Sequence, residues 1–198
     1  MATIERGVVL VERIIERLAP HVNGFVQGAS AGALDEIESR IMVELPPTLR
    51  RFLEFDFTFA SFGSRWQGKR RFGKTTRQPH ARVTSVRKLA EAMTELGWTS
   101  ARLKKRVIRL PNQPEHPWNC LYLGEPRHDG ELPILGMVND ETNVLVYLRY
   151  TAFDLYLLEQ SGLIELNDSA RLDDLESTLS LNPELGAIVP DDDYEPAF

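Results

Sequence analysis

Several classes of protein are excluded by what the chain lacks. Its single cysteine, Cys120, allows no disulfide within the chain, and its four histidines are scattered singly, without the spacing of metal ligands. No apolar run approaches the roughly 18 residues that span a bilayer. Residues 1–20 alternate apolar side chains with Glu and Arg, which excludes the apolar core of a secretory signal. We therefore expect a cytoplasmic protein without a metal site or a membrane span.

Basic side chains are scarce in the C-terminal part of the chain. Residues 111–198 carry 3 basic and 18 acidic side chains, whereas residues 61–110 carry 14 basic and 2 acidic ones. The net charge of −6 therefore combines two segments of opposite sign. Either these segments face each other and neutralise their charge, or each attracts a charged partner.

The remaining composition, 42% hydrophobic and 26% charged residues, is that of an ordinary globular protein. Apolar residues recur with helical spacing in the segments 4–18, 34–41, 49–53, 86–96, 153–161 and 170–179. Alternating apolar and polar residues or short apolar runs predict strands at 55–59, 118–123, 132–138 and 144–148. No internal repeat or domain boundary is evident. Residues 1–198 are therefore expected to form a single α+β domain.

Three parts of that domain differ from the rest in composition. Residues 1–29 are expected to form an N-terminal helix and turn. Residues 61–110 are expected to form a basic insertion that contains a helix of its own, and residues 165–198 an acidic C-terminal extension. The two charged parts are therefore candidates for contact with a partner.

Two patterns in the chain match those of enzymes, and the first surrounds Ser30. Gly28-Ala29-Ser30-Ala31-Gly32 fits G-x-S-x-G, the sharp strand-to-helix turn that exposes a nucleophilic serine in esterases. A helix does follow Ser30, but only one weak strand can precede it, and no room exists upstream for an oxyanion loop. We therefore interpret Ser30 as the N-cap of the following helix and expect no catalytic site.

The second pattern, Gly68-Lys-Arg-Arg-Phe-Gly73-Lys74-Thr75, matches the phosphate-binding loop G-x-x-x-x-G-K-[ST]. In such a loop Lys74 contacts the terminal phosphates of a nucleotide and Thr75 holds Mg²⁺. The context argues against this role, because no apolar strand leads into Gly68 and Pro79 breaks the helix that should follow. We therefore expect no cofactor, and a P-loop nucleotide-binding protein is kept as the alternative function.

The basic stretch from Arg65 to Arg109 offers a further alternative. Trp66 and Phe72 stand among its cations, and such a mixture can follow a phosphate backbone and stack on bases. The acidic C-terminal half opposes this function because it repels nucleic acid. We therefore interpret the stretch as a solvated surface and expect no nucleic-acid partner, with a phosphate- or nucleic-acid-binding module left open.

Two parts of the chain, residues 30–60 and 118–164, resemble a known family. The segment SAGALDEIESRIMVELPPTLRRFL, residues 30–53, is similar to the opening motif of the SUKH superfamily, the Smi/Knr-like proteins. That motif is a capped helix with an acidic and hydrophobic face, then Leu-Pro, then a short helix that ends in an aromatic residue and Leu. The matching residues are Ile37, Glu38, Leu45, Pro46, Arg50, Phe52 and Leu53. Residues 132–164 resemble the closing unit of the superfamily, two strands joined by a polar turn and a helix that opens near Phe153.

The resemblance implies a small antiparallel sheet flanked by helices, and a function in binding without catalysis. Bacterial members of the superfamily mostly act as immunity proteins that neutralise a cognate toxin, often a nuclease. A nuclease presents a cationic cleft, and clustered carboxylates attract such a cleft. We therefore expect a non-enzymatic immunity-type protein whose partner is a cognate toxin and whose partner-binding residues are Glu125, Asp129, Glu131, Asp140, Glu141, Asp191, Asp192, Asp193 and Glu195.

The nucleotide alternative is testable with one substitution. If Lys74 contacts phosphates, ATP or GTP with Mg²⁺ binds the wild-type protein, and Lys74→Ala weakens this binding by about tenfold or more. Because we expect no cofactor, our prediction is that isothermal titration calorimetry detects binding to neither protein. Equal binding by both would also exclude Lys74 as a phosphate ligand.

Overall fold

The structure, a computed structural model, describes residues 5–21, 28–56, 103, 105–110, 118–140 and 143–187. In this part the elements, in chain order, are α1 (Val8–Leu18), η1 (Ala19–His21), α2 (Ala31–Ile41), α3 (Pro47–Phe55), β1 (Val107–Arg109), β2 (Trp118–Tyr122), β3 (Ile134–Asp140), β4 (Asn143–Tyr150), α5 (Phe153–Gln160), α6 (Asp168–Arg171), α7 (Leu175–Leu181) and η3 (Pro183–Ala187). The strands form one antiparallel sheet in the order β1-β2-β3-β4. The α+β fold expected from the sequence is therefore confirmed.

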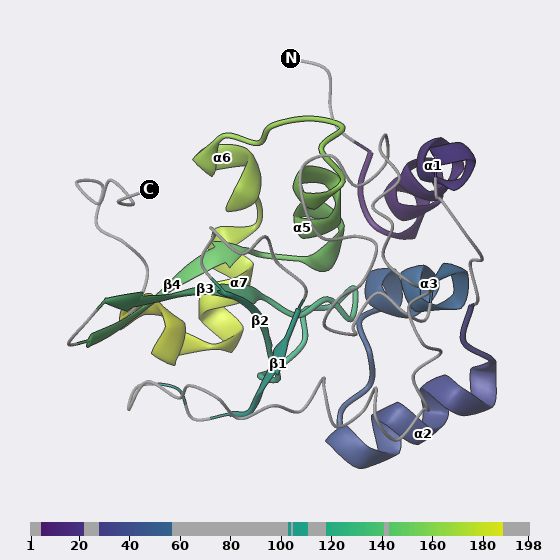
Figure 1. Cartoon of the computed structure of the whole chain (residues 1–198). Helices are drawn as coiled ribbons and strands as arrows, with labels where there is room; N and C mark the ends of the chain where they lie inside the picture. Colours follow the sequence, from purple (N-terminus) through teal and green to yellow (C-terminus); the bar gives the residue numbers. More distant parts are fainter. Residues whose placement is uncertain are drawn as a thin grey trace.

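The sheet has helices on both faces. Successive residues of a strand point to opposite sides, so Leu121 of β2 packs in one cluster with α1, α2, α3 and α5. Cys120 and Tyr122 pack in a second cluster with residues of α7 and η3. Figure 1 shows α5 and α6 on one side of the strands and α7 on the other. The connection of α6 and α7 therefore carries the chain from one helical layer to the other.

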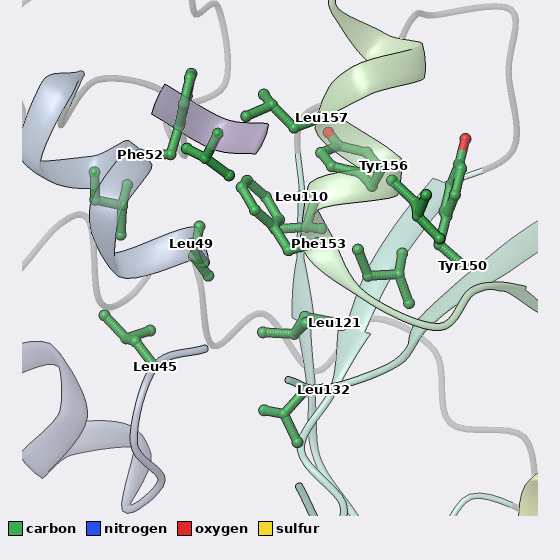
Figure 2. Packing of buried hydrophobic residues seen from close by; sticks show 14 of the residues in the cluster. Leu45, Leu49, Phe52, Leu110, Leu121, Leu132, Tyr150, Phe153, Tyr156 and Leu157 are labelled. Atoms are coloured by element: carbon green, nitrogen blue, oxygen red, sulfur yellow. The ribbon is translucent and has the colours of Figure 1, made fainter. Parts of the chain in front are cut away.

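Aromatic side chains join the helices to the sheet in the larger cluster (Figure 2). The ring of Phe52 in α3 lies 6.2 Å from that of Phe153 in α5, and Phe153 lies 5.4 Å from Tyr156. Tyr156 meets Tyr150 of β4 edge to face at 5.7 Å. All four side chains are buried. Continuous aromatic packing thus connects α3, α5 and β4.

Local sequence explains where the helices begin. Ser30 is the N-cap of α2, as predicted, and its hydroxyl accepts a hydrogen bond from Ala33 N at 3.3 Å. α3 begins at Pro47, where the missing N–H of proline removes no helical hydrogen bond. Pro46 before α3 and Ala152 before α5 provide no capping side chain. The starts of α3 and α5 therefore depend on groups from elsewhere in the fold.

The segment around Ser30 begins a helix and follows no strand in the described part of the chain. Residues 28–30 belong to no helix or strand. Ala29 N donates to Leu53 O near the end of α3 at 2.9 Å. The G-x-S-x-G pattern is therefore placed at a helix start that packs beside α3.

Two predictions of secondary structure are wrong, and one strand was not predicted. Phe55 does not begin the strand predicted at 55–59, because it ends α3 and packs edge to face on Phe52 at 5.9 Å, and residues 57–59 lie outside the described part of the chain. The helix predicted for residues 170–179 is two helices, because Asp174 adopts a left-handed conformation with φ 62°. The unpredicted strand, β1, lies within the part assigned to the basic insertion.

The other helices and strands predicted for described residues are present, with bounds that differ by a few residues. The expected strands overlap β2, β3 and β4, and the helix expected after them is α5, which Gly162 follows with φ 71°. The helices expected in the first half correspond to α1, α2 and α3. The helix predicted at 86–96 and the phosphate-binding pattern at 68–75 lie outside the described residues.

The loop after β2 is fixed by Asn182, which follows α7. The buried side chain of Asn182 accepts a hydrogen bond from Glu125 N at 2.8 Å and donates one to Glu125 O at 2.9 Å. Its carboxamide thus bonds to both backbone groups of Glu125, as the backbone of a neighbouring strand would. This approach leaves no room at Gly124, where an added Cβ lies 2.0 Å from Asn182 Oδ1. The contact therefore fixes the start of the loop that carries Glu125 and Asp129.

Gly124→Ala is expected to lower the free energy of unfolding by about 1–3 kcal/mol, because the methyl group displaces the Asn182 carboxamide from its buried partners. Gly32→Ala is the matched control, since an added Cβ on this residue of α2 has nothing within 4 Å. It should raise stability by up to about 1 kcal/mol. Urea denaturation compares the two, and equal effects would show that Asn182 does not restrict Gly124.

Candidate functional site

Exposed carboxylates gather where the connection of α6 and α7 meets the loop after β2. We call this surface the acidic ridge and define it by the exposed side chains of Asp129, Asp168, Asp173, Asp174 and Glu176. Three guanidinium groups lie beneath these carboxylates, those of Arg6, Arg127 and Arg171. Each of them contacts two carboxylates, so four of the five ridge carboxylates are paired with an arginine and are not independent surface charges.

Arg127 joins the loop after β2 to the connection of α6 and α7. Only 4% of its side chain is exposed, and its Nε and Nη2 donate to the two oxygens of Asp129. Its Nη1 lies 3.0 Å from Asp174 Oδ2 without the alignment of a hydrogen bond. The side chains of Asp129 and Asp174 are 37% and 51% exposed. A buried cation thus holds two carboxylates at the surface.

Arg6, which lies just before α1, binds a carboxylate of the ridge. Its Nε and Nη2 donate to the buried Asp154 at 2.7 and 3.0 Å, and its Nη1 donates to Asp173 at 2.5 Å. Asp154 also accepts from Gly7 N at 2.7 Å and from Leu155 N at 2.8 Å. Gly7 has φ 73° and ψ −151°, a backbone conformation that is strained for every residue except glycine. One buried carboxylate therefore holds the start of α1, the start of α5 and the cation beneath Asp173.

Arg171 repeats this arrangement at the end of α6. Its Nη1 donates to the exposed Asp168 at 2.7 Å, and its Nη2 donates to Glu159 of α5 at 2.6 Å. Glu159 is partly buried and also accepts from the Tyr150 hydroxyl, to which Arg149 Nε donates at 3.2 Å. The outer ion pair is therefore connected to the aromatic core through Tyr150.

The connection of α6 and α7 is also attached to the end of β4. Thr151 N donates to Arg171 O at 3.2 Å, and the Thr151 hydroxyl donates to Asp173 O. Asp174 occupies the N-cap position of α7, but its carboxylate makes no capping hydrogen bond. The carboxylate contacts Arg127 instead. An aspartate at this position ordinarily caps its own helix, but Asp174 belongs to the ridge.

The guanidinium groups keep neighbouring carboxylates ionised. Partial burial by itself raises the pKa of Asp129, but the bonds from Arg127 and from Glu131 N outweigh it and lower that pKa below its ordinary value. Burial likewise opposes the bonds that Arg171 and Tyr150 donate to Glu159, and the bonds again prevail, so the pKa of Glu159 is lowered. These carboxylates therefore stay negative at neutral and mildly acid pH.

The geometry of the ridge suits a cationic ligand. The five exposed carboxylates, with the inner carboxylates of Asp154 and Glu159, outnumber the three guanidinium groups. Because the cations lie beneath the anions, an approaching molecule meets carboxylate oxygens, which accept hydrogen bonds from Lys or Arg. A basic protein surface or peptide has the complementary chemistry.

The described ranges of the chain contain neither a cluster of metal ligands nor a helix that could cross a membrane. No group of three or more His, Cys, Asp or Glu side chains among these residues has an arrangement that could hold a metal ion. None of the helices described there has both the length and the apolar character needed to cross a bilayer.

The structure describes three of the side chains that the sequence predicted to bind a partner. Asp129 belongs to the acidic ridge, and Glu125 is exposed and pairs with Lys105 at 3.1 Å. Glu131 is only 3% exposed, so its assignment to a partner-binding surface is wrong. The side chains of the remaining predicted residues lie outside the described part of the chain, and these residues are Asp140, Glu141, Asp191, Asp192, Asp193 and Glu195.

Glu131 is buried because helix starts provide its partners. Thr48 N and the Thr48 hydroxyl donate to its two oxygens at 3.1 and 2.7 Å, and Phe153 N lies 3.5 Å from one of them. Burial raises the pKa of Glu131 to about 7, because the lowering effect of these bonds is smaller and the charge of Asp154 adds to the rise. This carboxylate therefore bonds to the starts of α3 and α5 and is not exposed at the surface.

Sequence reasoning missed the ridge residues on the connection of α6 and α7. Helical spacing predicts one helix over residues 170–179, which places these carboxylates on an ordinary polar face. The overlooked signal is the Asp-Asp pair between Leu172 and Leu175, because an aspartate before an apolar residue marks the start of a helix. Nothing local in the sequence indicates that the distant Arg6 and Arg127 lie beneath them.

Comparisons of the chain with models of protein families, with curated proteins and with solved structures found no match.

Arg127→Met is expected to lower the free energy of unfolding by about 1–2 kcal/mol, because Asp129 and Asp174 lose their cation but stay hydrated. The pKa of Asp129 should rise, since the guanidinium no longer opposes its partial burial. Urea denaturation measures the first effect, and carbon-13 NMR titration of the carboxyl group measures the second.

Arg40→Met is the control for Arg127→Met, because it removes an exposed pair with Glu36 within α2. This control should change stability by less than about 0.5 kcal/mol. An unchanged titration of Asp129 in Arg127→Met would refute the role given to the buried guanidinium.

Proposed function

We propose that this protein is a non-enzymatic, immunity-type protein that binds a cognate toxin through the acidic ridge and covers a cationic surface of that toxin. The observation that carries the proposal is the position of Arg127, whose buried guanidinium holds Asp129 and Asp174 at the surface. Carboxylates held in this way lose little side-chain freedom when they bind Lys or Arg. Such preorganised charge favours fast and selective association.

The charge of the ridge indicates the chemistry of the partner. A nuclease attracts phosphates with a cationic cleft, and carboxylates at fixed positions offer that cleft an alternative negative surface. Nucleic acid is disfavoured as a ligand of the ridge because its phosphates carry the same sign of charge. A cationic toxin surface therefore fits the ridge better than a nucleic acid does.

The resemblance to the SUKH superfamily supports the same function. The elements that the resemblance implies are present in order, with α2 behind its N-cap Ser30, the Leu45-Pro46 pair, and α3 with the buried Phe52. They are followed by antiparallel strands and by α5, which begins at Phe153. Immunity proteins of that superfamily act by binding, which agrees with a ridge built from fixed charges.

The experiment uses the protein encoded by the neighbouring gene as the probe. We expect it to be toxic when expressed alone, to be neutralised by this chain, and to bind it in surface plasmon resonance. Asp173→Asn, Asp174→Asn and Glu176→Gln, combined in one variant, should slow association by about tenfold and reduce its dependence on salt.

A variant with the same net charge provides the control. Glu12→Gln, Glu16→Gln and Glu36→Gln neutralise three exposed carboxylates on α1 and α2, far along the chain from the ridge. This control should alter the association rate by less than about threefold. Equal slowing in both variants would assign the effect to net charge, and a neighbouring product that neither harms cells nor binds would reject the proposed function.

A further inference from the structure

Glu131 places one buried carboxylate at the starts of two helices. It accepts from Thr48 N at 3.1 Å, from the Thr48 hydroxyl at 2.7 Å and from Phe153 N at 3.5 Å. Thr48 is the second residue of α3, and Phe153 is the first residue of α5. The N-cap residues of these helices, Pro46 and Ala152, offer no capping side chain. The positive ends of two helix dipoles therefore converge on Glu131.

The charges around Glu131 do not include a cation bonded to it. The charged or titratable residues of its own turn and of the start of α5 are Arg127, His128, Asp129 and Asp154. Arg127 is engaged by the acidic ridge, His128 is exposed, and Asp154 is bound by Arg6. The two arginines of α3 pair with carboxylates of α1, α2 and α3 itself. Among the described residues, no Lys, Arg or His forms an ion pair with Glu131.

A buried carboxylate to which no cation is bonded takes up a proton readily, because burial penalises only its charged form. Burial raises the pKa of Glu131 to about 7, although the bonds from Thr48 and Phe153 favour the ionised form. The ionised group accepts all three bonds. The protonated group must donate from one oxygen, and of its partners only the Thr48 hydroxyl can accept. Its attraction to both helix ends is then weaker.

We propose that Glu131 is a proton-operated joint between α3 and α5, which clamps both helix starts when ionised and releases the start of α5 when protonated. The contact with Phe153 N opens first, because it is the longest and shares Oε2 with the Thr48 hydroxyl. Arg127 N donates to Glu131 O at 3.0 Å, and Glu131 N donates to Asp129 Oδ1 at 3.2 Å. The backbone of Glu131 is therefore bonded to Asp129, a carboxylate of the ridge. The joint operates whatever the ridge binds.

The joint links protonation to folding with a definite sign. Unfolded Glu131 ionises near its ordinary pKa of 4.5, whereas folded Glu131 keeps its proton up to about pH 7. Between these values the folded chain binds more protons than the unfolded chain. Stability from this residue is therefore complete below pH 4.5 and is lost as the pH rises to about 7. The folding equilibrium constant should fall on the order of 10²-fold across this interval.

Carbon-13 NMR titration of the Glu131 carboxyl group in the full-length protein tests the joint directly. We expect a midpoint near pH 7 and an amide resonance of Phe153 that moves with the same midpoint. A carboxyl group that stays ionised down to about pH 5 would overturn the joint. So would a Phe153 amide that does not respond to the titration of Glu131.

Two variants separate the joint from general effects on stability. Glu131→Gln removes the titratable carboxyl group. It should therefore flatten the dependence on pH of the free energy of urea unfolding between about pH 5 and about pH 8. Glu125→Gln, which changes an exposed carboxylate in the same loop, should keep the wild-type slope. Retention of that slope in Glu131→Gln would refute the joint, and the wild-type titration decides the matter if Glu131→Gln does not fold.

Discussion

Two buried carboxylates, Glu131 and Asp154, meet the starts of three helices at one place in the fold. Asp154 accepts from Gly7 N before α1 and from Leu155 N in α5, and Glu131 accepts from α3 and α5. The N–H groups at helix starts have no partners within the helix and are positive, so they offset the cost of burying a carboxylate. α1, α3 and α5 also contact one another through the core. Their arrangement therefore depends on these polar contacts as well as on apolar packing.

The acidic ridge is attached to the same place. Arg6 binds Asp154 with one side of its guanidinium and Asp173 with the other, and Arg127 lies in the same turn as Glu131. The groups that position the helices thus also position the exposed carboxylates. Ion pairs near the surface contribute little to stability, because water competes for both charges. Three buried or partly buried guanidinium groups under one surface are better explained by the need to orient its carboxylates.

Local sequence predicted most of the described helices and strands, because apolar spacing and capping act over a few residues. Ser30 marks the start of α2, and Gly162 marks the end of α5. The errors arose where a local sequence pattern is compatible with two different secondary structures. Phe55 continues α3 because its ring packs on Phe52, and the helix over residues 170–179 is interrupted where Asp174 turns the backbone.

The sequence by itself determined that negative charge is concentrated after residue 110 and that helices and strands are mixed in one domain. Only the tertiary structure decided which carboxylates are exposed. Asp129 and Glu131 are two positions apart, yet Gly130, with φ 80°, turns the chain so that Glu131 reaches Thr48, 83 positions away. Arg6 meets Asp173 across 167 positions. Burial and charge pairing depend on such distant contacts, and these exist only once the whole chain has folded.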